Sequence, residues 1–314
     1  MALKRFDLII NKKILPYKKV ISVDSDKSIS IRTFLIGAIS QNLSIANNVL
    51  ESDDVFSTIQ CLKKLGVKIE KKNNRYLIYG KGLGSLKIKK KGKLNFGNSG
   101  TLSRLLLGIL STTPQINVNV TGDHSLNKRS MKSLIELMSK FGAYFLPKNK
   151  FNFPLKLVST EMPIGISYKA GVSAQLKSAV MFAGLNSYGN TTIIETQKSR
   201  NHTENMLLNN SEAIKISNQR KKTITIFGKK HLNPFIIDVP NDPSSAAFFS
   251  ALTILNKDSS IVIKNVCLND TRTGFYQILK KQGAKIKYKN IKKNNNELRG
   301  DLLIKSCKLK PINA

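Results

Sequence analysis

Arginine side chains in this lysine-rich chain gather at a few short polar turns. Five of its nine arginines stand in or just after such turns: Arg32, Arg104, Arg129, Arg200 and Arg272. A guanidinium group binds carboxylate and phosphate oxygens through two parallel hydrogen bonds, which the lysine ammonium cannot do. We therefore expect several turns to converge on one cleft that binds phosphorylated, carboxylated metabolites.

The turns precede stretches whose composition is typical of buried helices. The apolar stretches 31–40, 102–111, 174–185 and 244–255 follow the turns DSDKS (24–28), FGNSGT (96–101), AGVS (170–173) and PNDPS (240–244). Ser, Thr, Asn and Asp cap the free N–H groups of a helix start, and that start carries partial positive charge that suits anions. Ser28 and Arg32 are four residues apart and Thr101 and Arg104 are three apart, so each pair shares a helix face.

Each turn taken singly has a simpler explanation, a capped helix start without a ligand. Asp123, Asp242 and Asp270 all precede predicted helices, where a capping or turn role is the more economical interpretation. His202 follows the turn residue Asn201, where it could touch a ligand, cap the helix or lie at the surface. It is the set of turns, and no single one of them, that indicates a binding cleft.

A repeat of about 70 residues organises the chain. An amphipathic helix, a glycine, a strand, a polar turn and a second strand are predicted at 56–80, 131–158 and 275–305, with a weaker copy at 203–228 that lacks the glycine. Gly66, Gly142 and Gly283 end three of these helices, because the left-handed position after a helix suits a residue without Cβ. The pattern predicts an α/β fold in which each unit holds one apolar helix, one amphipathic helix and several strands.

The composition of the chain indicates which kinds of ligand it binds. The 314 residues carry 52 Lys and Arg against 19 Asp and Glu, a net charge of +33, and 41% are hydrophobic, enough to form two compact bodies. Most basic residues are lysines, and we predict that their dense runs, such as KKNNR (71–75) and KNIKKNNN (289–296), are hairpin tips. Nucleic-acid binding would more often gather arginines and aromatic residues on one face, so the charge favours small anionic ligands.

The sequence lacks the motifs that would indicate several other classes of protein. Three scattered cysteines and three histidines provide no disulfide framework and no metal-ligand spacing. No apolar run approaches the roughly 18–20 residues of a membrane span, and the first residues lack a secretory signal pattern, so a cytoplasmic protein is expected. There is no GxxxxGK[ST] or GxSxG motif, and GKGLG (80–84) introduces no helix.

The motifs resemble those of the EPSP synthase (3-phosphoshikimate 1-carboxyvinyltransferase) family. Matching stretches, in the family's order from about residue 20 onward, include DKSISIR (26–32), GNSGTLSRLLLG (97–108), GDHSLNKRSM (122–131), SAQLKSAVMFAGL (173–185), KSRNHTENML (198–207), VPNDPSSAAFF (239–249) and NDTRTG (269–274). The resemblance implies the enolpyruvyl transferase fold, an inside-out α/β barrel of two domains, each with three βαβαββ units. It also implies transfer of the enolpyruvyl group of phosphoenolpyruvate to the 5-hydroxyl of shikimate 3-phosphate, on the route to chorismate and aromatic amino acids. No cofactor or metal is implied, nor any nucleic-acid or membrane partner, and the family suggests a monomer.

The same resemblance assigns expected roles to residues. Lys27 would contact both substrates and serve in proton transfer. The other residues expected at shikimate 3-phosphate are Ser28, Arg32, Ser173, Ala174, Gln175, Ser199 and Arg200. Those expected at phosphoenolpyruvate, besides Lys27, are Asn98, Gly100, Thr101, Arg104, Arg129 and Gln175. Asn201 stands where the family usually has Asp, which leaves the neighbouring anion-binding side chains in place.

The chain is shorter than the family pattern requires, because six units of this size need on the order of 420 residues. We expect residues 23–237 to form a complete three-unit domain with the shikimate-phosphate site, and residues 1–22 with 238–314 to form an incomplete second domain. The family's catalytic Asp and its Lys-Glu-x-x-Arg segment have no equivalent here, so we expect this chain alone to be inactive or nearly so. The alternative function is a non-catalytic remnant of the same fold that binds anions or nucleic acid.

Overall fold

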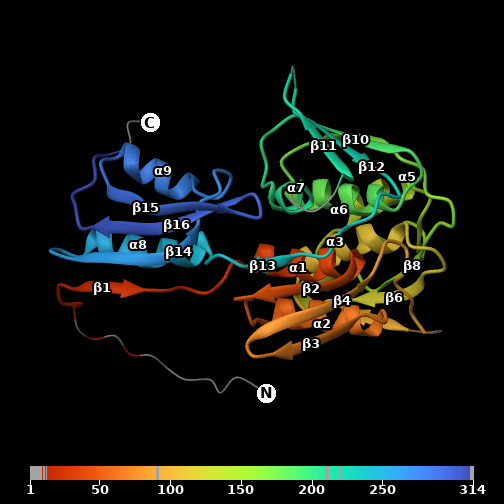
Figure 1. The fold of residues 1–314 in the computed structure, drawn as a ribbon, viewed down its shortest axis with the longest axis horizontal. Coiled ribbons are helices and arrows are strands. Elements are labelled where there is room, and N and C mark those ends of the chain that lie inside the picture. Colours follow the sequence, from red (N-terminus) through yellow and green to blue (C-terminus); the bar gives the residue numbers. More distant parts are fainter. Residues whose placement is uncertain are drawn as a thin grey trace.

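The structure is a computed structural model that describes residues 9, 11, 13–89, 92–208, 212–219 and 221–311. Within these residues the chain forms nine helices and sixteen strands (Figure 1). The helices are α1 (Lys27–Ile39), α2 (Asp53–Lys64), α3 (Gly100–Ser111), α4 (His124–Lys128), α5 (Lys132–Lys140), α6 (Ala174–Leu185), α7 (His202–Leu208), α8 (Pro243–Leu255) and α9 (Gly274–Lys281). The strands are β1 (Lys18–Ile21), β2 (Gln41–Asn47), β3 (Lys68–Lys72), β4 (Arg75–Lys81), β5 (Lys93–Asn95), β6 (Asn117–Thr121), β7 (Tyr144–Leu146), β8 (Leu155–Val158), β9 (Ser167–Ala170), β10 (Asn190–Glu195), β11 (Ile214–Ser217), β12 (Thr223–Phe227), β13 (Ile236–Asp238), β14 (Ser260–Cys267), β15 (Lys285–Asn294) and β16 (Glu297–Lys305).

One sheet topology recurs through the molecule. The described strands form four sheets of four strands, ordered β13-β2-β4-β3, β5-β6-β8-β7, β9-β10-β12-β11 and β1-β14-β16-β15. In each sheet the first two strands run parallel, and the last two form an antiparallel hairpin paired to the second strand. The repeat predicted from the sequence is confirmed in all four units.

The helices also follow the predicted repeat. The four apolar stretches become α1, α3, α6 and α8, and the amphipathic stretches become α2, α5, α7 and α9. Gly66, Gly142 and Gly283 have φ angles of +86°, +99° and +88°, the left-handed conformation expected at these helix ends.

Three of the sheets surround a helical core, and together with α1–α7 they make up what we call the large body (Figure 1). Its central helices α1, α3 and α6 are buried on most sides, because their apolar residues face one another as well as the sheets. Gly108 lets α3 and α6 pack closely together, because a Cβ at this position would lie 2.5 Å from the backbone oxygen of Ala179 in α6.

The fourth sheet forms the small body, together with α8 and α9 (Figure 1). It has its own cluster of buried apolar side chains, separate from that of the large body among the described residues. Its apolar helix α8 lies on one sheet and leaves Phe248 and Leu255 80% and 79% exposed. No described helix packs on α8 as α3 and α6 pack in the large body.

The chain passes between the two bodies twice, and the two passages lie side by side. One follows β1 and the other follows β13. The Asp26 N–H donates to the Pro240 carbonyl and the Asp242 N–H donates to the Asp24 carbonyl, each at 2.8 Å. These bonds fix the start of α1 beside the start of α8.

One predicted hairpin tip is misplaced. The run KNIKKNNN (289–296) lies mostly within β15, and only Asn295 and Asn296, with φ of +47° and +58°, form the turn. Pairing with the mostly buried strand β16 extends β15 through these lysines, with a register shift between Lys289 and Lys292. For KKNNR (71–75) the prediction is confirmed, because Asn73 and Asn74 form the turn between β3 and β4.

A buried ion cluster supports the turn that precedes α7. Lys177 of α6 is fully buried, with its Nζ 2.5 Å from Glu195 Oε1 and 2.6 Å from Glu204 Oε1. Lys222 adds a second contact to Glu195, at 2.7 Å. Burial raises the pKa of Glu195, but hydrogen bonds and charge from Lys177 and Lys222 outweigh it and lower that pKa to about 2. Glu195 therefore remains an anion through the neutral and mildly acidic range.

None of the helices in the described part of the chain is both long and apolar enough to cross a membrane.

The close approach of α3 and α6 predicts that Gly108→Ala destabilises the protein. The added methyl group overlaps backbone that cannot move freely, so we expect a loss of about 1–3 kcal/mol in unfolding free energy. Urea denaturation measures it. Gly274→Ala, at the first position of α9 with no atom within 4 Å of its Cβ, is the matched control. Equal stability of the two variants would contradict the packing described here.

The Glu195 cluster predicts a specific loss of stability in acid. The folded-state pKa lies below the ordinary value of 4.5, so the unfolded chain takes up the proton first and stability falls from about pH 4.5 toward pH 2. We expect on the order of 3 kcal/mol to be lost over that range. Glu195→Gln should be less stable at neutral pH and should lose less on acidification.

Urea unfolding at a series of pH values tests this, with Glu136→Gln as control because Glu136 is 55% exposed. The prediction is wrong if Glu195→Gln and wild type lose stability in parallel between neutral pH and the acid range.

Candidate anion-binding site

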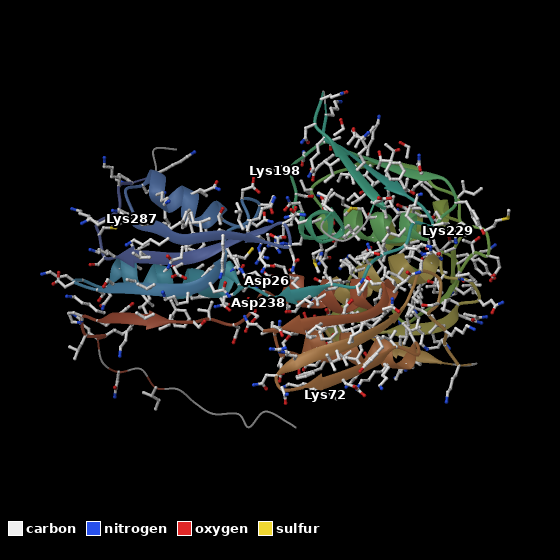
Figure 2. The ribbon with its side chains drawn as sticks, in the orientation of Figure 1. Asp26, Lys72, Lys198, Lys229, Asp238 and Lys287 are labelled. Carbon is white, nitrogen blue, oxygen red and sulfur yellow. The ribbon has the colours of Figure 1, made fainter. Side chains whose placement is uncertain are left out.

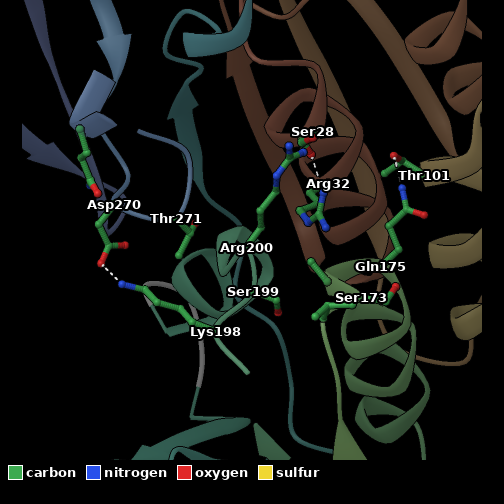
Figure 3. A pocket seen from close by; sticks show the side chains of 13 residues that line it. Ser28, Arg32, Thr101, Ser173, Gln175, Lys198, Ser199, Arg200, Asp270 and Thr271 are labelled. Carbon is green, nitrogen blue, oxygen red and sulfur yellow. Dashed lines mark hydrogen bonds and ion pairs between the residues drawn. The ribbon is translucent and has the colours of Figure 1, made fainter. Parts of the chain in front are cut away.

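A cavity of about 610 Å³ opens where the large body faces the segment before α9. Residues from the starts of α1, α3 and α6 line it, together with the turn before α7 and residues of the small body (Figure 3). We call it the first cavity; its lining is Ser28, Arg32, Thr101, Val172, Ser173, Ala174, Gln175, Lys198, Ser199, Arg200, Asp270, Thr271 and Gln277.

A second cavity of about 500 Å³ adjoins the first. Thr101 and Gln175 line both, and Gln175 Nε2 donates to Thr101 Oγ1 at 3.0 Å (Figure 3). The lining of the second cavity is Lys27, Asp54, Asn98, Gly100, Thr101, Arg104, Arg129 and Gln175. Two ligands, or two parts of one reacting pair, can therefore meet at Thr101 and Gln175.

Capped helix starts position these side chains. Asp26 caps α1 by accepting from the Ile29 N–H at 2.9 Å. Ser99 and Ser173 cap α3 and α6 in the same way, each at 3.3 Å. The caps satisfy one N–H group each and leave others in the first turn free for a ligand, where the helix dipole is positive.

The arginines of the two cavities have no carboxylate partner among the described residues. Arg32, Arg104, Arg129 and Arg200 form no described ion pair. Arg32 is 3% exposed, and its hydrogen bonds go to neutral oxygens: Thr203 Oγ1, the Ser28 carbonyl and Ser178 Oγ. Burial lowers the pKa of Arg32 to about 10, although Glu204 and Asp26 partly offset it, so the group is cationic at neutral pH.

Two neighbouring guanidinium groups give the second cavity its positive charge. Burial and then the charge of Arg129 lower the pKa of Arg104. Arg104 Nη1 donates to the Gly100 carbonyl at 3.1 Å, and Arg129 Nη2 donates to Asn98 Oδ1 at 2.7 Å. A Cβ on Gly100 would lie 3.0 Å from Arg104 Nη1 and 3.3 Å from Arg129 Nη1, so this glycine leaves room for both groups. A bound anion would relieve the repulsion between them.

The first cavity is also positively charged. Burial and then the charge of Arg272 lower the pKa of Arg200, despite nearby Asp26 and Asp242. Ser199 beside it is buried, and its N–H and hydroxyl both donate to Glu195 Oε1, at 3.2 and 3.1 Å. Glu195 therefore holds the turn that presents Arg200.

Two lysines of the cavities do have acidic partners. Lys27 Nζ lies 3.0 Å from Asp54 Oδ2 in the second cavity, with the lysine side chain 49% exposed. Lys198 Nζ lies 2.7 Å from Asp270 Oδ2 across the first cavity, joining the large body to the small one (Figure 3). These pairs keep each ammonium group close to the space that a ligand would occupy.

Sequence reasoning missed several of the lining residues. Asp54 gives only the signal of an acidic residue in the first turn of α2, which the helix dipole explains without a ligand. Lys198 and Thr271 lie inside motifs that we recognised but were not themselves singled out, and Asp270, which we interpreted as a capping or turn residue, lines the first cavity. Val172 and Gln277 carry no sequence signal of a site.

Arg272 departs from the expectation that the arginines at turns line the cleft. Its side chain is 3% exposed and lines neither cavity. It is instead paired to Asp26 at 2.7 Å and to Asp242 at 2.8 Å. Burial lowers the pKa of Arg272, but these two carboxylates outweigh it and raise that pKa.

The structure decides between the roles that the sequence allowed for Asp123, Asp242 and His202. Asp123 and Asp242 are helix caps, accepting from the Leu126 and Ser244 N–H groups at 2.7 Å each. His202 neither faces a ligand cavity nor lies at the surface: it is buried, with its Nδ1 2.7 Å from Glu297 Oε1. Among the described residues no group of three His, Cys, Asp or Glu side chains is placed to hold a metal ion.

The residues singled out from the sequence thus come together in two adjoining cavities. Those expected at phosphoenolpyruvate all line the second cavity, and those expected at shikimate 3-phosphate line the first, except Lys27, which lies in the second. Their roles toward a substrate remain predictions.

Comparison with known proteins supports the resemblance found in the sequence motifs. The model of the family "EPSP synthase (3-phosphoshikimate 1-carboxyvinyltransferase)" matches residues 12–313. The 3-phosphoshikimate 1-carboxyvinyltransferase of Paramagnetospirillum magneticum is 37% identical over 308 residues, which cover 97% of this chain and 69% of that protein. The protein of the same name from Bacillus subtilis is 41% identical over 293 residues, covering 93% of this chain and 67% of that protein.

A solved structure agrees in fold. EPSP synthase from Acinetobacter baumannii superposes with a TM-score of 0.84 at 35% sequence identity, over 95% of this chain and 68% of that one. The family model spans nearly the whole chain, and the relatives exceed one third identity over most of it. The chain therefore belongs to the EPSP synthase family.

Proposed function

We propose that this protein takes part in the transfer of the enolpyruvyl group of phosphoenolpyruvate to the 5-hydroxyl of shikimate 3-phosphate, with release of phosphate. The observation that carries this proposal is the set of four arginines without carboxylate partners, arranged around two cavities that meet at Thr101 and Gln175. Two anionic substrates that must react with each other need such an arrangement.

We assign shikimate 3-phosphate to the first cavity. Ser28 and Arg32 come from α1, while Ser173, Ala174 and Gln175 come from the start of α6. Ser199 and Arg200 approach from the turn before α7, on the same cavity. Hydroxyl groups, helix-start N–H groups and guanidinium groups are the donors that bind phosphate oxygens well.

We assign phosphoenolpyruvate to the second cavity. Its phosphate and carboxylate would be held by Arg104, Arg129 and the N–H groups of the turn at Asn98, Gly100 and Thr101. Lys27 lies between this group and the first cavity in our assignment, where its ammonium group would contact both substrates. The Asp54 carboxylate, 3.0 Å from Lys27 Nζ, holds that ammonium group in place.

In the reaction the 5-hydroxyl oxygen loses its proton and bonds to C2 of phosphoenolpyruvate, while the C2–C3 double bond opens and a proton is added to C3. The adduct then loses phosphate through cleavage of the bond between C2 and the phosphate oxygen, and a proton leaves the new methyl group to restore the double bond. We assign proton transfer to Lys27, and charge stabilisation to the arginines and helix starts of both cavities.

We further propose that residues 23–237 form one domain with the shikimate-phosphate site, and that residues 1–22 and 238–314 belong to a second. The separate apolar clusters and the pairing of β1 with β14 support this division. The family suggests a monomer, and the composition suggests a cytoplasmic protein that binds no nucleic acid; we propose both for this chain.

Calorimetric titration with shikimate 3-phosphate tests the first assignment, since binding needs no turnover. Arg200→Ala should weaken binding by about tenfold to a hundredfold, because it removes a charge-assisted contact to phosphate. Arg75→Ala removes the same charge from an exposed position that lines neither cavity and is the matched control. Equal loss in both variants would mean that net charge alone drives binding.

A steep salt dependence, together with binding to DNA and indifference to shikimate 3-phosphate, would instead favour the anion-binding or nucleic-acid-binding alternative.

The second assignment predicts that Arg129→Ala weakens the binding of phosphoenolpyruvate by about tenfold or more, measured with shikimate 3-phosphate present at saturation. The affinity for shikimate 3-phosphate itself should change little. Lys128→Ala, one residue earlier and outside both cavities, is the control. The assignment is wrong if Arg129→Ala weakens shikimate 3-phosphate and leaves phosphoenolpyruvate unaffected.

A further inference from the structure

Arg272 occupies the junction where the chain passes between the two bodies. It lies in the small body, between β14 and α9, and its side chain is 3% exposed. Figure 2 shows Asp26 and Asp238 at this same junction. The guanidinium group is therefore placed to act on both bodies at once.

The first contact of Arg272 reaches the start of α1. Its Nη1 donates to Asp26 Oδ2 at 2.7 Å, while Asp26 Oδ1 accepts from the Ile29 N–H at 2.9 Å. Both oxygens of Asp26 are thereby occupied, and the aspartate is fully buried. Since Lys27 and Ser28 follow Asp26 directly, their positions depend on this fixed cap.

The second contact reaches the start of α7. Arg272 Nη1 lies 3.2 Å from Nε2 of His202, whose Nδ1 is held by Glu297. Asn269, three residues before Arg272, donates to Asn201 Oδ1 at 2.8 Å. Asn201 and His202 follow Arg200, so the same segment of the small body fixes the turn that presents Arg200.

The third contact ties Arg272 to its own body. Nη2 donates to Asp242 Oδ1 at 2.8 Å and to Ser244 Oγ at 3.1 Å, at the start of α8. One guanidinium group thus joins the starts of three helices. A lysine ammonium is a compact point charge and cannot span these acceptors at once.

We propose that Arg272 is a positioning residue: by bridging the starts of α1, α7 and α8, it sets the placement of Lys27, Ser28 and Arg200 in the two cavities. This inference rests on the proposed function for its ligand. Arg272 lines neither cavity and is paired with two carboxylates, so besides the charge that it places near Arg200 its contribution is geometric.

A second buried arginine provides a matched control. Arg299 of β16 is also in the small body, 6% exposed, and pairs with Asp238 at the end of β13 in the large body. It joins the two bodies as Arg272 does, but it contacts no helix start. Loss of either arginine weakens the junction, while only loss of Arg272 should disturb the cavities.

The test compares Arg272→Lys with Arg299→Lys in calorimetric titrations with shikimate 3-phosphate. Both changes retain the charge, so long-range electrostatics stays constant. We expect Arg272→Lys to weaken binding by about tenfold or more and Arg299→Lys to leave it unchanged. Equal effects of the two variants, or no effect of Arg272→Lys, would overturn the proposal.

Asp26→Asn keeps the proposal testable if Arg272→Lys does not fold. The asparagine oxygen still caps α1, but the ion pair to Arg272 is lost. Removing a negative charge beside an anion site should by electrostatics alone tighten binding, whereas loss of positioning should weaken it. Tighter or unchanged binding in Asp26→Asn would overturn the proposal.

Amide spectra of the ¹⁵N-labelled protein separate this inference from the proposed function. If wild type does not bind shikimate 3-phosphate, the proposed function fails. The positioning role is then judged by the amide resonances of Lys27, Ser28 and Arg200. Shifts in Arg272→Lys that are absent in Arg299→Lys support it, and unmoved resonances overturn it.

Discussion

Positive charge without a protein counterion is the constraint on which this structure depends. Arg32, Arg104, Arg129 and Arg200 line two adjoining cavities and have no carboxylate partner among the described residues. Burial lowers the pKa of Arg32, Arg104 and Arg200, and the charge of a neighbouring arginine lowers each of them further. Such an arrangement is costly for the unliganded protein, and a bound anion offsets the cost by supplying the missing charge.

The repeated unit explains how the cations come together. Each copy places an apolar helix after a capped polar turn, and packing α1, α3 and α6 against one another gathers their starts around Thr101 and Gln175. The buried pair of Lys177 and Glu195 then holds the turn before α7 against the same cavity. Burial of apolar helices, which stabilises the large body, is thus also what concentrates the charge.

The sequence predicted the features that depend on local residues. Helix caps in the turns DSDKS and AGVS and the left-handed glycines follow from patterns a few residues long, and the four-fold repeat follows from the recurrence of these patterns; all are found. Arg272 could not be distinguished from Arg200, because both stand at polar turns before helices. What separates them is the pairing of Arg272 with Asp26, 246 residues away, and with Asp242. Contacts of that range, like the pairing of β15 with β16 that carries lysines into a strand, depend on tertiary packing.

A crystal structure of the protein with shikimate 3-phosphate would show whether the unpaired arginines bind the ligand. We expect electron density for the ligand phosphate in the first cavity, within hydrogen-bond distance of Ser173, Ser199 and Arg200. Density for the phosphate at the surface lysines, or an empty cavity at saturating ligand, would contradict the claim that these unpaired guanidinium groups form a site for an anionic substrate.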